Sequence, residues 1–285
     1  MKRILLIFIS ILFFNNKSYS QSNDTEALLY NISIGGVFGT IGAILNKKPN
    51  QKLDKVIFKG FSQGSLGGYL TFESKRILRL GAENEDWKLI WAAKLLNAGG
   101  VSIKDNAAHN NNFWDKWHIN IGFNRFEFET KKKFKMNYKI MPVSLVYNTI
   151  AFSQAKFDFN TSIKTGEFIF QSDDKRLYEG GVTRGLTFPG LIVLIKEGKN
   201  FNTITHEVIH IYQSNDFSIL NSFYAKPLKK IESKYNFINK INNYIYYDFH
   251  YLPLRQLYNY ETYTANKYYD NYFEHEAAYF SNTLN

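Results

Sequence analysis

Strict alternation of apolar and polar residues marks the middle of this chain. In FKMNYKIM, residues 134 to 141, the aromatic and aliphatic side chains fall on one face and the lysines and asparagine on the other. A period of two predicts a half-buried strand. The same alternation occurs in WHINIGF before it and in VSLVYNTI, AKFDFNT and GEFIFQS after it, with short polar breaks between these stretches. We therefore expect an antiparallel meander of about five strands within residues 113–198.

An outer-membrane barrel shows the same alternation and is the alternative for this region. Such barrels need at least about eight strands of roughly ten residues each. The stretches found here are fewer and shorter. We therefore favour the meander.

The preceding region, residues 26–100, has a helical and glycine-rich pattern. Glycines recur there at three- and four-residue spacing, at positions 35, 36, 39 and 42 and again at 64, 67 and 68. Small residues at this spacing let two helices, or a helix and a sheet, approach closely. We expect close packing inside one globule; the alternative is a helix pair that contacts a membrane or forms an oligomer. DWKLIWAAKLLN, residues 86–97, predicts an amphipathic helix that ends at Gly99 and Gly100.

The last third of the chain returns to a helical pattern. GLIVLIKEG, residues 190–198, is a short continuous apolar run and predicts a strand buried on both faces. Asn200, Asn202, Thr203 and Thr205 can each cap a helix that begins near residue 205. YFEHEAAYFSN, residues 272–282, predicts a terminal helix. The fold class is therefore α+β: a glycine-rich helical N-terminal region, a central β-meander, and C-terminal helices over residues 203–285, in a single domain from residue 21 onward.

Residues 1–20 have the pattern of a secretory signal peptide. Lys2 and Arg3 precede an apolar run from Ile4 to Phe14, and Ser18 and Ser20 supply small residues before a cleavage point. A membrane anchor is the alternative, but the run is shorter than the roughly 20 residues that span a bilayer. We expect an exported protein, periplasmic or associated with the outer membrane or secreted, with no transmembrane helix in the mature chain. It has no Cys, so its stability must come from its core or from a metal.

The charge of the mature chain is basic. Cleavage leaves 32 Lys and Arg against 25 Asp and Glu, a net charge of +7. A basic exported protein can contact an anionic envelope surface. The lysines are spread along the chain and no nucleic-acid motif accompanies them, so we expect no nucleic-acid partner.

ITHEVIHIYQ, residues 204–213, carries the candidate chemistry. On a helix His206 and His210 lie one turn apart on the same face, which is the spacing that two ligands of one metal ion need. Roughly 0.006 His-Glu-x-x-His matches would arise by chance in a chain of this composition. Glu207 is then the base that takes a proton from a metal-bound water. Gln213 lies near the same face, and can contact a ligand or remain a surface residue.

A third protein ligand must come from elsewhere, because HEVIH is not followed by a third His at the expected spacing. The terminal helix offers three candidates. Glu276 falls on the apolar stripe of Phe273 and Ala277, and a carboxylate on a buried face needs a partner that a metal would supply. We therefore expect Glu276 as the third ligand, with Glu274 and His275 as the alternatives.

HEVIH followed by a glutamate on a later helix resembles the zincin metallopeptidases of the gluzincin type. The resemblance implies Zn²⁺ as cofactor, His206, His210 and Glu276 as its ligands, and Glu207 as catalytic base. The form HExxHxxQ, with Gln213, is also similar to zincin-like domains of exported and toxin-associated bacterial proteins. The resemblance covers about ten residues and a short C-terminal helix.

Two functions follow as hypotheses. The first is an exported zinc-dependent hydrolase, a metallopeptidase acting on a peptide or protein substrate. The second is a non-catalytic structural protein of the envelope or outer membrane that retains a zincin-like helix, and that associates through its glycine-rich helices and basic surface. An open cleft beside Glu207 would favour the first.

Overall fold

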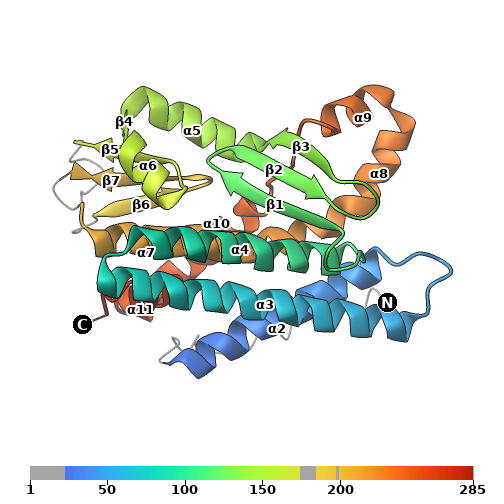
Figure 1. Ribbon diagram of the computed structural model, residues 1–285, viewed down its shortest axis with the longest axis horizontal. Coiled ribbons are helices and arrows are strands. Elements are labelled where there is room, and N and C mark those ends of the chain that lie inside the picture. Colours follow the sequence, from blue (N-terminus) through green and yellow to red (C-terminus); the bar gives the residue numbers. More distant parts are fainter. Residues whose placement is uncertain (1–22, 174–183, 197–198, 285) are drawn as a thin grey trace.

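The computed structural model describes residues 23–173, 184–196 and 199–284. The signal peptide expected over residues 1–20 lies outside these described residues. The described part begins with three long helices, α2 (Asp24–Leu45), α3 (Leu53–Asn84) and α4 (Trp87–Ala108), which pack side by side (Figure 1). They confirm the expected helical N-terminal region.

The glycines of α2 and α3 lie where the two backbones touch. A Cβ atom at Gly64 would be 2.1 Å from the carbonyl oxygen of Gly35, and one at Gly68 would be 2.2 Å from that of Asn31. Real atoms do not approach so closely, so only glycine permits this helix spacing. The glycine pattern is thus used for packing inside the chain, as expected.

Helix α4 is longer than the sequence pattern predicts. It runs through Gly99 and Gly100 to Ala108 instead of ending at the glycine pair. Gly100 lies against α3, where a Cβ atom would be 2.8 Å from the carbonyl oxygen of Gly67. Gly100 therefore allows contact between helices and does not terminate one.

Helix α2 is, within the described residues, the one helix long and apolar enough to cross a membrane by length and composition. A core helix or a signal sequence near the N-terminus passes the same test. The absence of a transmembrane helix from the mature chain therefore stays a prediction.

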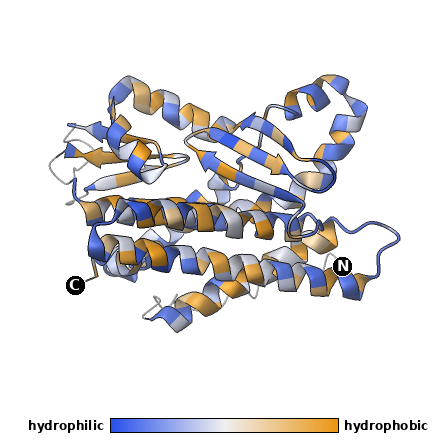
Figure 2. Cartoon of the chain, viewed as in Figure 1, coloured by the Kyte–Doolittle hydropathy of each residue, from blue (hydrophilic) through white to orange (hydrophobic). Residues whose placement is uncertain are grey.

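The first sheet is an antiparallel meander of three strands, β1 (Lys116–Ile121), β2 (Asn124–Glu129) and β3 (Lys135–Ile140), in the order β1-β2-β3. Figure 2 shows hydrophobic and hydrophilic residues alternating along these strands, as the period of two predicts. Trp117 pairs with Phe128, and Phe128 pairs with Met136 on the next strand. Two of the expected strands, WHINIGF and FKMNYKIM, are thus confirmed, and β2 between them is an additional strand.

Of the other predicted strands, GEFIFQS forms β5 (Ile169–Ser172) in a second sheet, and the remaining two stretches have different structures. VSLVYNTI lies in a helix, α5 (Pro142–Gln154), with Pro142 in its first turn and Ser144, Asn148 and Ala151 on its buried side. AKFDFNT contributes only the two-residue strand β4 (Lys156–Phe157) before α6 (Phe159–Thr165) begins. The buried positions of α5 are mostly small and polar, whereas Val146 and Ile150, which contributed to the strand pattern, are exposed.

The second sheet is mixed, with the order β4-β5-β7-β6. It comprises β5 (Ile169–Ser172), β6 (Gly185–Phe188) and β7 (Leu191–Ile195) beside β4. β7 is buried along its whole length and pairs in parallel with β5 and antiparallel with β6, which confirms the expected buried strand. β6 lies at the edge of this sheet.

The rest of the described chain is helical. Its first and last helices pack against α3, and two short helices between them stand beside the first sheet (Figure 1). The helical segments are α7 (Phe201–Asp216), η3 (Phe217–Tyr224), α8 (Ala225–Lys234), α9 (Asn236–Asn242), α10 (Tyr251–Thr264), η4 (Tyr268–Asp270) and α11 (Tyr272–Phe280). The main core gathers apolar residues of α3, α4, β5, β7, α7 and α11. Helix α7 therefore packs against several other elements. The mixture of helices with two separate sheets confirms the α+β class.

Candidate metal centre

Helix α7 carries the two histidines of HEVIH. Asn200 caps it, with its side chain accepting a hydrogen bond from the Thr203 backbone at 2.7 Å. The sides of the helix that face the core carry the buried residues Val208, Ile209 and Ile211. The two imidazoles project from another side, and each remains 13% exposed.

Helix α11 brings a carboxylate to both imidazoles. Asn271 caps this helix by accepting hydrogen bonds from the backbone of Phe273 and Glu274. Glu274 therefore stands in the first turn, and its Oε2 lies 3.2 Å from Nε2 of His206 and its Oε1 3.5 Å from Nε2 of His210. The two Nε2 atoms are themselves 3.2 Å apart.

These three residues form a group able to hold a metal ion, with ligand atoms that all lie within 4.8 Å of one another. Zinc binds imidazole nitrogen at about 2.0–2.1 Å, so the ligand atoms of a tetrahedral site lie about 3.3 Å apart. The observed separations of 3.2, 3.2 and 3.5 Å are close to that value, with one oxygen of Glu274 near His206 and the other near His210. Two histidines and one glutamate also leave a fourth position open, as catalytic zinc sites do.

Gln213 fixes which nitrogen of His210 faces the group. The amide nitrogen of Gln213 donates to the carbonyl of Phe273 at 2.8 Å and to Oε2 of Glu276 at 3.0 Å, so its Oε1 must face His210. Nδ1 of His210 lies 2.8 Å from that oxygen and is therefore the donor. A neutral His210 then presents the lone pair of Nε2 to His206 and Glu274. Convergent lone pairs of this kind need a cation or a proton between them.

The pKa values of His210 and Glu274 are each shifted by the charge of the other. Burial would lower the pKa of His210, but the carboxylate of Glu274 raises that pKa to about 9. Burial would likewise raise the pKa of Glu274, but His210 and His206 hold it well below its usual range. Without a metal, a proton on His210 compensates the carboxylate, so metal and proton compete for the same atoms.

Two tyrosines complete the surroundings of Glu274. The hydroxyl of Tyr258 donates to Oε1 at 2.6 Å, and the hydroxyl of Tyr268 donates to Oε2. Both belong to a tyrosine-rich stretch, residues 258–273, whose composition alone gives no sign of a link to Glu274. Charge-assisted hydrogen bonds of this type orient a ligating carboxylate.

Glu207 lies on the same helix, next to His206, and contacts the second sheet. The hydroxyl of Thr187 on β6 donates to Oε2 of Glu207 at 2.8 Å. A Cβ atom at Gly185 would be 2.7 Å from Oε1, so the glycine leaves room for the carboxylate. Burial raises the pKa of Glu207, although the neighbouring His210 and His206 act in the opposite direction.

Glu276, the expected third ligand, does not join the two histidines, and the alternative Glu274 lies beside them instead. Glu276 is 1% exposed and does have the partner that a buried carboxylate needs. That partner is Lys75 of α3, whose Nζ lies 3.0 Å from Oε1 of Glu276 and 2.8 Å from Oε2 of Asp216. The expectation that Glu276 is buried and paired is confirmed, and its partner is the ammonium group of Lys75.

The other residues considered from the sequence lie elsewhere. His275 is not part of the metal-ligating group. Tyr279, on the same helix, donates its hydroxyl to Asp24 at 2.8 Å. The structure thus gathers His206, His210, Glu274 and, beside them, Glu207.

A scan against protein-family models, a search of curated proteins and a search of solved structures each gave no match to this chain.

Proposed function

We propose that this protein is an exported zinc-dependent hydrolase, most simply a metallopeptidase. The observation that carries the proposal is the convergence of His206 Nε2, His210 Nε2 and the carboxylate of Glu274 at separations of 3.2 to 3.5 Å. Two imidazoles and a carboxylate are the ligand set of hydrolytic zinc sites. Zinc bound there would supply a polarised water with a pKa near 7.

Glu207 is the general base in this proposal. Thr187 holds one of its carboxylate oxygens, and the other faces Gly185. Because burial raises its pKa, the carboxyl group is better suited to accept a proton and return it than an ordinary surface glutamate. Its position next to His206 places it beside the metal ligands.

An extended peptide is the substrate class that fits the surroundings. Among the described strands, β6 pairs with β7 only, and it carries both residues that contact Glu207. An unpaired strand edge binds an extended chain through backbone hydrogen bonds. A substrate strand along β6 would lie next to the base.

The alternative is a non-catalytic protein associated with the envelope. Its main support in the sequence was the glycine-rich pattern, and these glycines lie in contacts between helices of the same chain. The basic surface remains a possible contact for anionic envelope material. Glu207 is buried, and it lines neither the cavity beside Lys116 nor the one beside Lys94. The hydrolase proposal therefore rests on the convergence of His206, His210 and Glu274 and not on a cleft beside the base.

Elemental analysis of the purified protein tests the metal, with the His206→Ala, His210→Ala double variant as comparison. We expect one zinc per chain, lost in the double variant. Peptide-library cleavage then tests the base: Glu207→Gln should keep the zinc and lose roughly 10²–10⁴-fold in rate. Absence of metal after zinc is offered would overturn the proposal, and zinc without cleavage of any peptide would favour the alternative.

A further inference from the structure

A second polar site lies in a cavity bounded by α4, β1, β2 and the segment from η3 to residue 247. The cavity has a volume of about 250 Å³, and none of its lining residues belongs to the metal centre. Ligand pockets typically span about 300–1,000 Å³, so this one suits a small molecule. Charged and aromatic side chains line it, among them Lys116, Arg125, Glu127, Lys229 and Tyr246.

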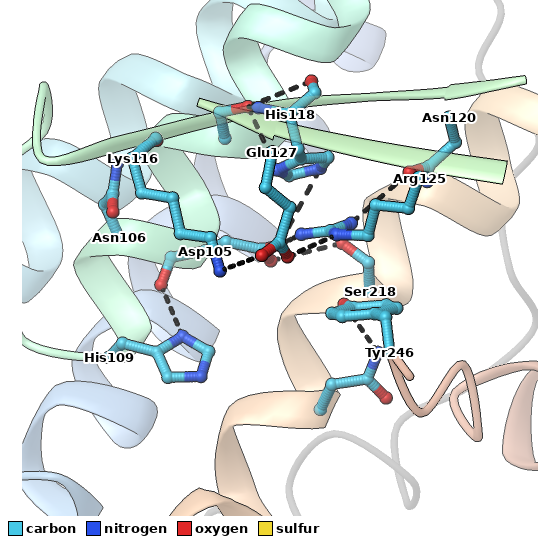
Figure 3. A network of polar contacts seen from close by, with 12 residues as sticks. Asp105, Asn106, His109, Lys116, His118, Asn120, Arg125, Glu127, Ser218 and Tyr246 are labelled. Carbon is cyan, nitrogen blue, oxygen red and sulfur yellow. Dashed lines mark hydrogen bonds and ion pairs between the residues drawn. The ribbon is translucent and has the colours of Figure 1, made fainter. Parts of the chain in front are cut away.

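One buried carboxylate at this cavity faces three cations. Glu127 is 1% exposed, and its oxygens lie 2.7 Å from Nζ of Lys116, 2.8 Å from Nε of Arg125 and 3.6 Å from Nζ of Lys139 (Figure 3 shows the first two). A single carboxylate cannot neutralise three cations. Positive charge is therefore left over at this wall.

Arg125 also contacts Tyr246 and Asp105. Its guanidinium lies 3.7 Å from the ring centre of Tyr246 and its Nη2 lies 3.5 Å from Oδ2 of Asp105. Figure 3 shows the ring of Tyr246 and the guanidinium group facing each other. The arginine is fixed before any ligand arrives, so little ordering would accompany binding.

A further cation lies on the exposed side of the cavity. Lys229 on α8 lines the cavity and is exposed, and no hydrogen bond or ion pair engages its ammonium group within the described residues. The third carboxylate of the lining, Glu232, accepts a hydrogen bond from Asn242 at 2.6 Å. The four cations of the lining therefore exceed the three carboxylates, and the carboxylates already have partners.

His109 faces the same space. Its Nδ1 donates to the carbonyl of Asp105 at 2.8 Å, which leaves Nε2 for another partner (Figure 3). Tyr224, Leu228 and Ile245 add apolar surface to the wall. The cavity thus combines a cationic end with an apolar flank.

We propose that this cavity binds a small organic anion, whose carboxylate or phosphate group meets Lys116, Lys139 and Lys229 and whose apolar body packs on Tyr246 and Leu228. The proposal is independent of the hydrolase function, because the two sites share no residue. A cationic ligand is disfavoured, since it would have to displace Arg125 or a lysine from the carboxylates. Whether its acidic group is a carboxylate or a phosphate, the ligand carries an oxyanion on an apolar group.

Isothermal titration of the full protein at low ionic strength tests this proposal, with benzoate and phenyl phosphate as the anionic probes. Benzamide, which has the shape of benzoate without its charge, is the neutral control. The variant is Lys229→Gln, and the matched control is Lys230→Gln, an exposed neighbour on α8 that does not line the cavity. Because both anions also bind zinc, the titrations are repeated with the His206→Ala, His210→Ala double variant.

We expect one anion per chain, with Kd weakened about tenfold by Lys229→Gln and unchanged by Lys230→Gln or by loss of the metal ligands. Tighter binding of benzoate or of phenyl phosphate identifies the headgroup, and either result supports the proposal. Three results would overturn it: no saturable binding of either anion, equal binding of benzamide, or binding that is insensitive to both Lys229→Gln and Lys139→Gln. The Lys139 variant leaves Glu127 with two cations, so its fold should be retained.

Discussion

Nδ1 of His210 donates a hydrogen bond to Oε1 of Gln213 at 2.8 Å, and the amide group of Gln213 is itself held by Phe273 and Glu276. Gln213, three residues beyond HEVIH, thus links a candidate metal ligand on α7 to α11. Glu276 in turn is paired with Lys75 on α3. The orientation of His210 therefore depends on three helices that are distant in sequence.

Replacing Gln213 tests this link. Gln213→Ala should weaken zinc binding roughly 10–100-fold, because His210 loses the partner that fixes its tautomer and ring orientation. Competition with a chelator measures the affinity. Asn202→Ala, on the same helix and away from the metal ligands, serves as the control. Equal zinc affinity in the Gln213 variant and the original protein would contradict a positioning role.

The identity of the third ligand is tested by a pair of variants on one helix. Glu274→Gln should remove stoichiometric zinc, because a neutral amide is a poor zinc ligand beside two imidazoles. Glu276→Gln should keep the zinc and instead lower the free energy of unfolding by roughly 2–4 kcal/mol, since Lys75 loses one of its two buried carboxylates. Elemental analysis and urea unfolding measure the two effects. The reverse pattern would restore Glu276 as the ligand.

Two glycines provide a matched test of the helix packing. Gly64→Ala should destabilise the protein by about 1–3 kcal/mol or more, because its Cβ atom would collide with the backbone of Gly35. Gly99→Ala should be neutral or stabilise by up to about 1 kcal/mol, since no atom lies within 4 Å of its Cβ position and alanine favours a helix. Thermal or urea unfolding distinguishes them. A harmless Gly64→Ala would show that α2 and α3 do not pack as closely as described.

Stability should fall in mild acid because of His250. Burial, with a smaller effect of Arg125, lowers the pKa of His250 from 6.5 to about 3. The folded state therefore keeps this histidine neutral while the unfolded chain takes up a proton below about pH 6.5. The stabilising contribution is complete above that pH and declines as pH falls toward 3. Between pH 7 and pH 5 the loss should be about 2 kcal/mol.

Urea unfolding at pH 7 and pH 5 measures this loss, and His250→Asn isolates the contribution of one residue. The variant should be less stable at pH 7 but should lose about 2 kcal/mol less between the two pH values. An unchanged pH dependence in the variant would assign the acid sensitivity to other groups, such as the buried His118, whose pKa is also lowered by burial.

Much of the local structure followed from short-range pattern. Alternation predicted β1 and β3 but not β2 between them, a continuous apolar run predicted β7, and the spacing of His206 and His210 placed both on one face of a helix. These features depend on residues no more than a few positions apart, where periodicity and capping decide. The pattern was misleading in α5, where small and polar residues, not the apolar ones, lie on the buried side.

Which carboxylate lies beside the two histidines, by contrast, was decided by tertiary structure. Glu274 and Glu276 stand on one short helix, are both buried, and point to different sides of it. Which of them meets the histidines depends on how α11 is turned against α7. Lys75, 201 positions away in the sequence, takes Glu276 as its counter-charge, and this leaves Glu274 to face His206 and His210. The sequence by itself determined that a buried carboxylate would need a partner, and only the packing of three distant helices assigned the partners.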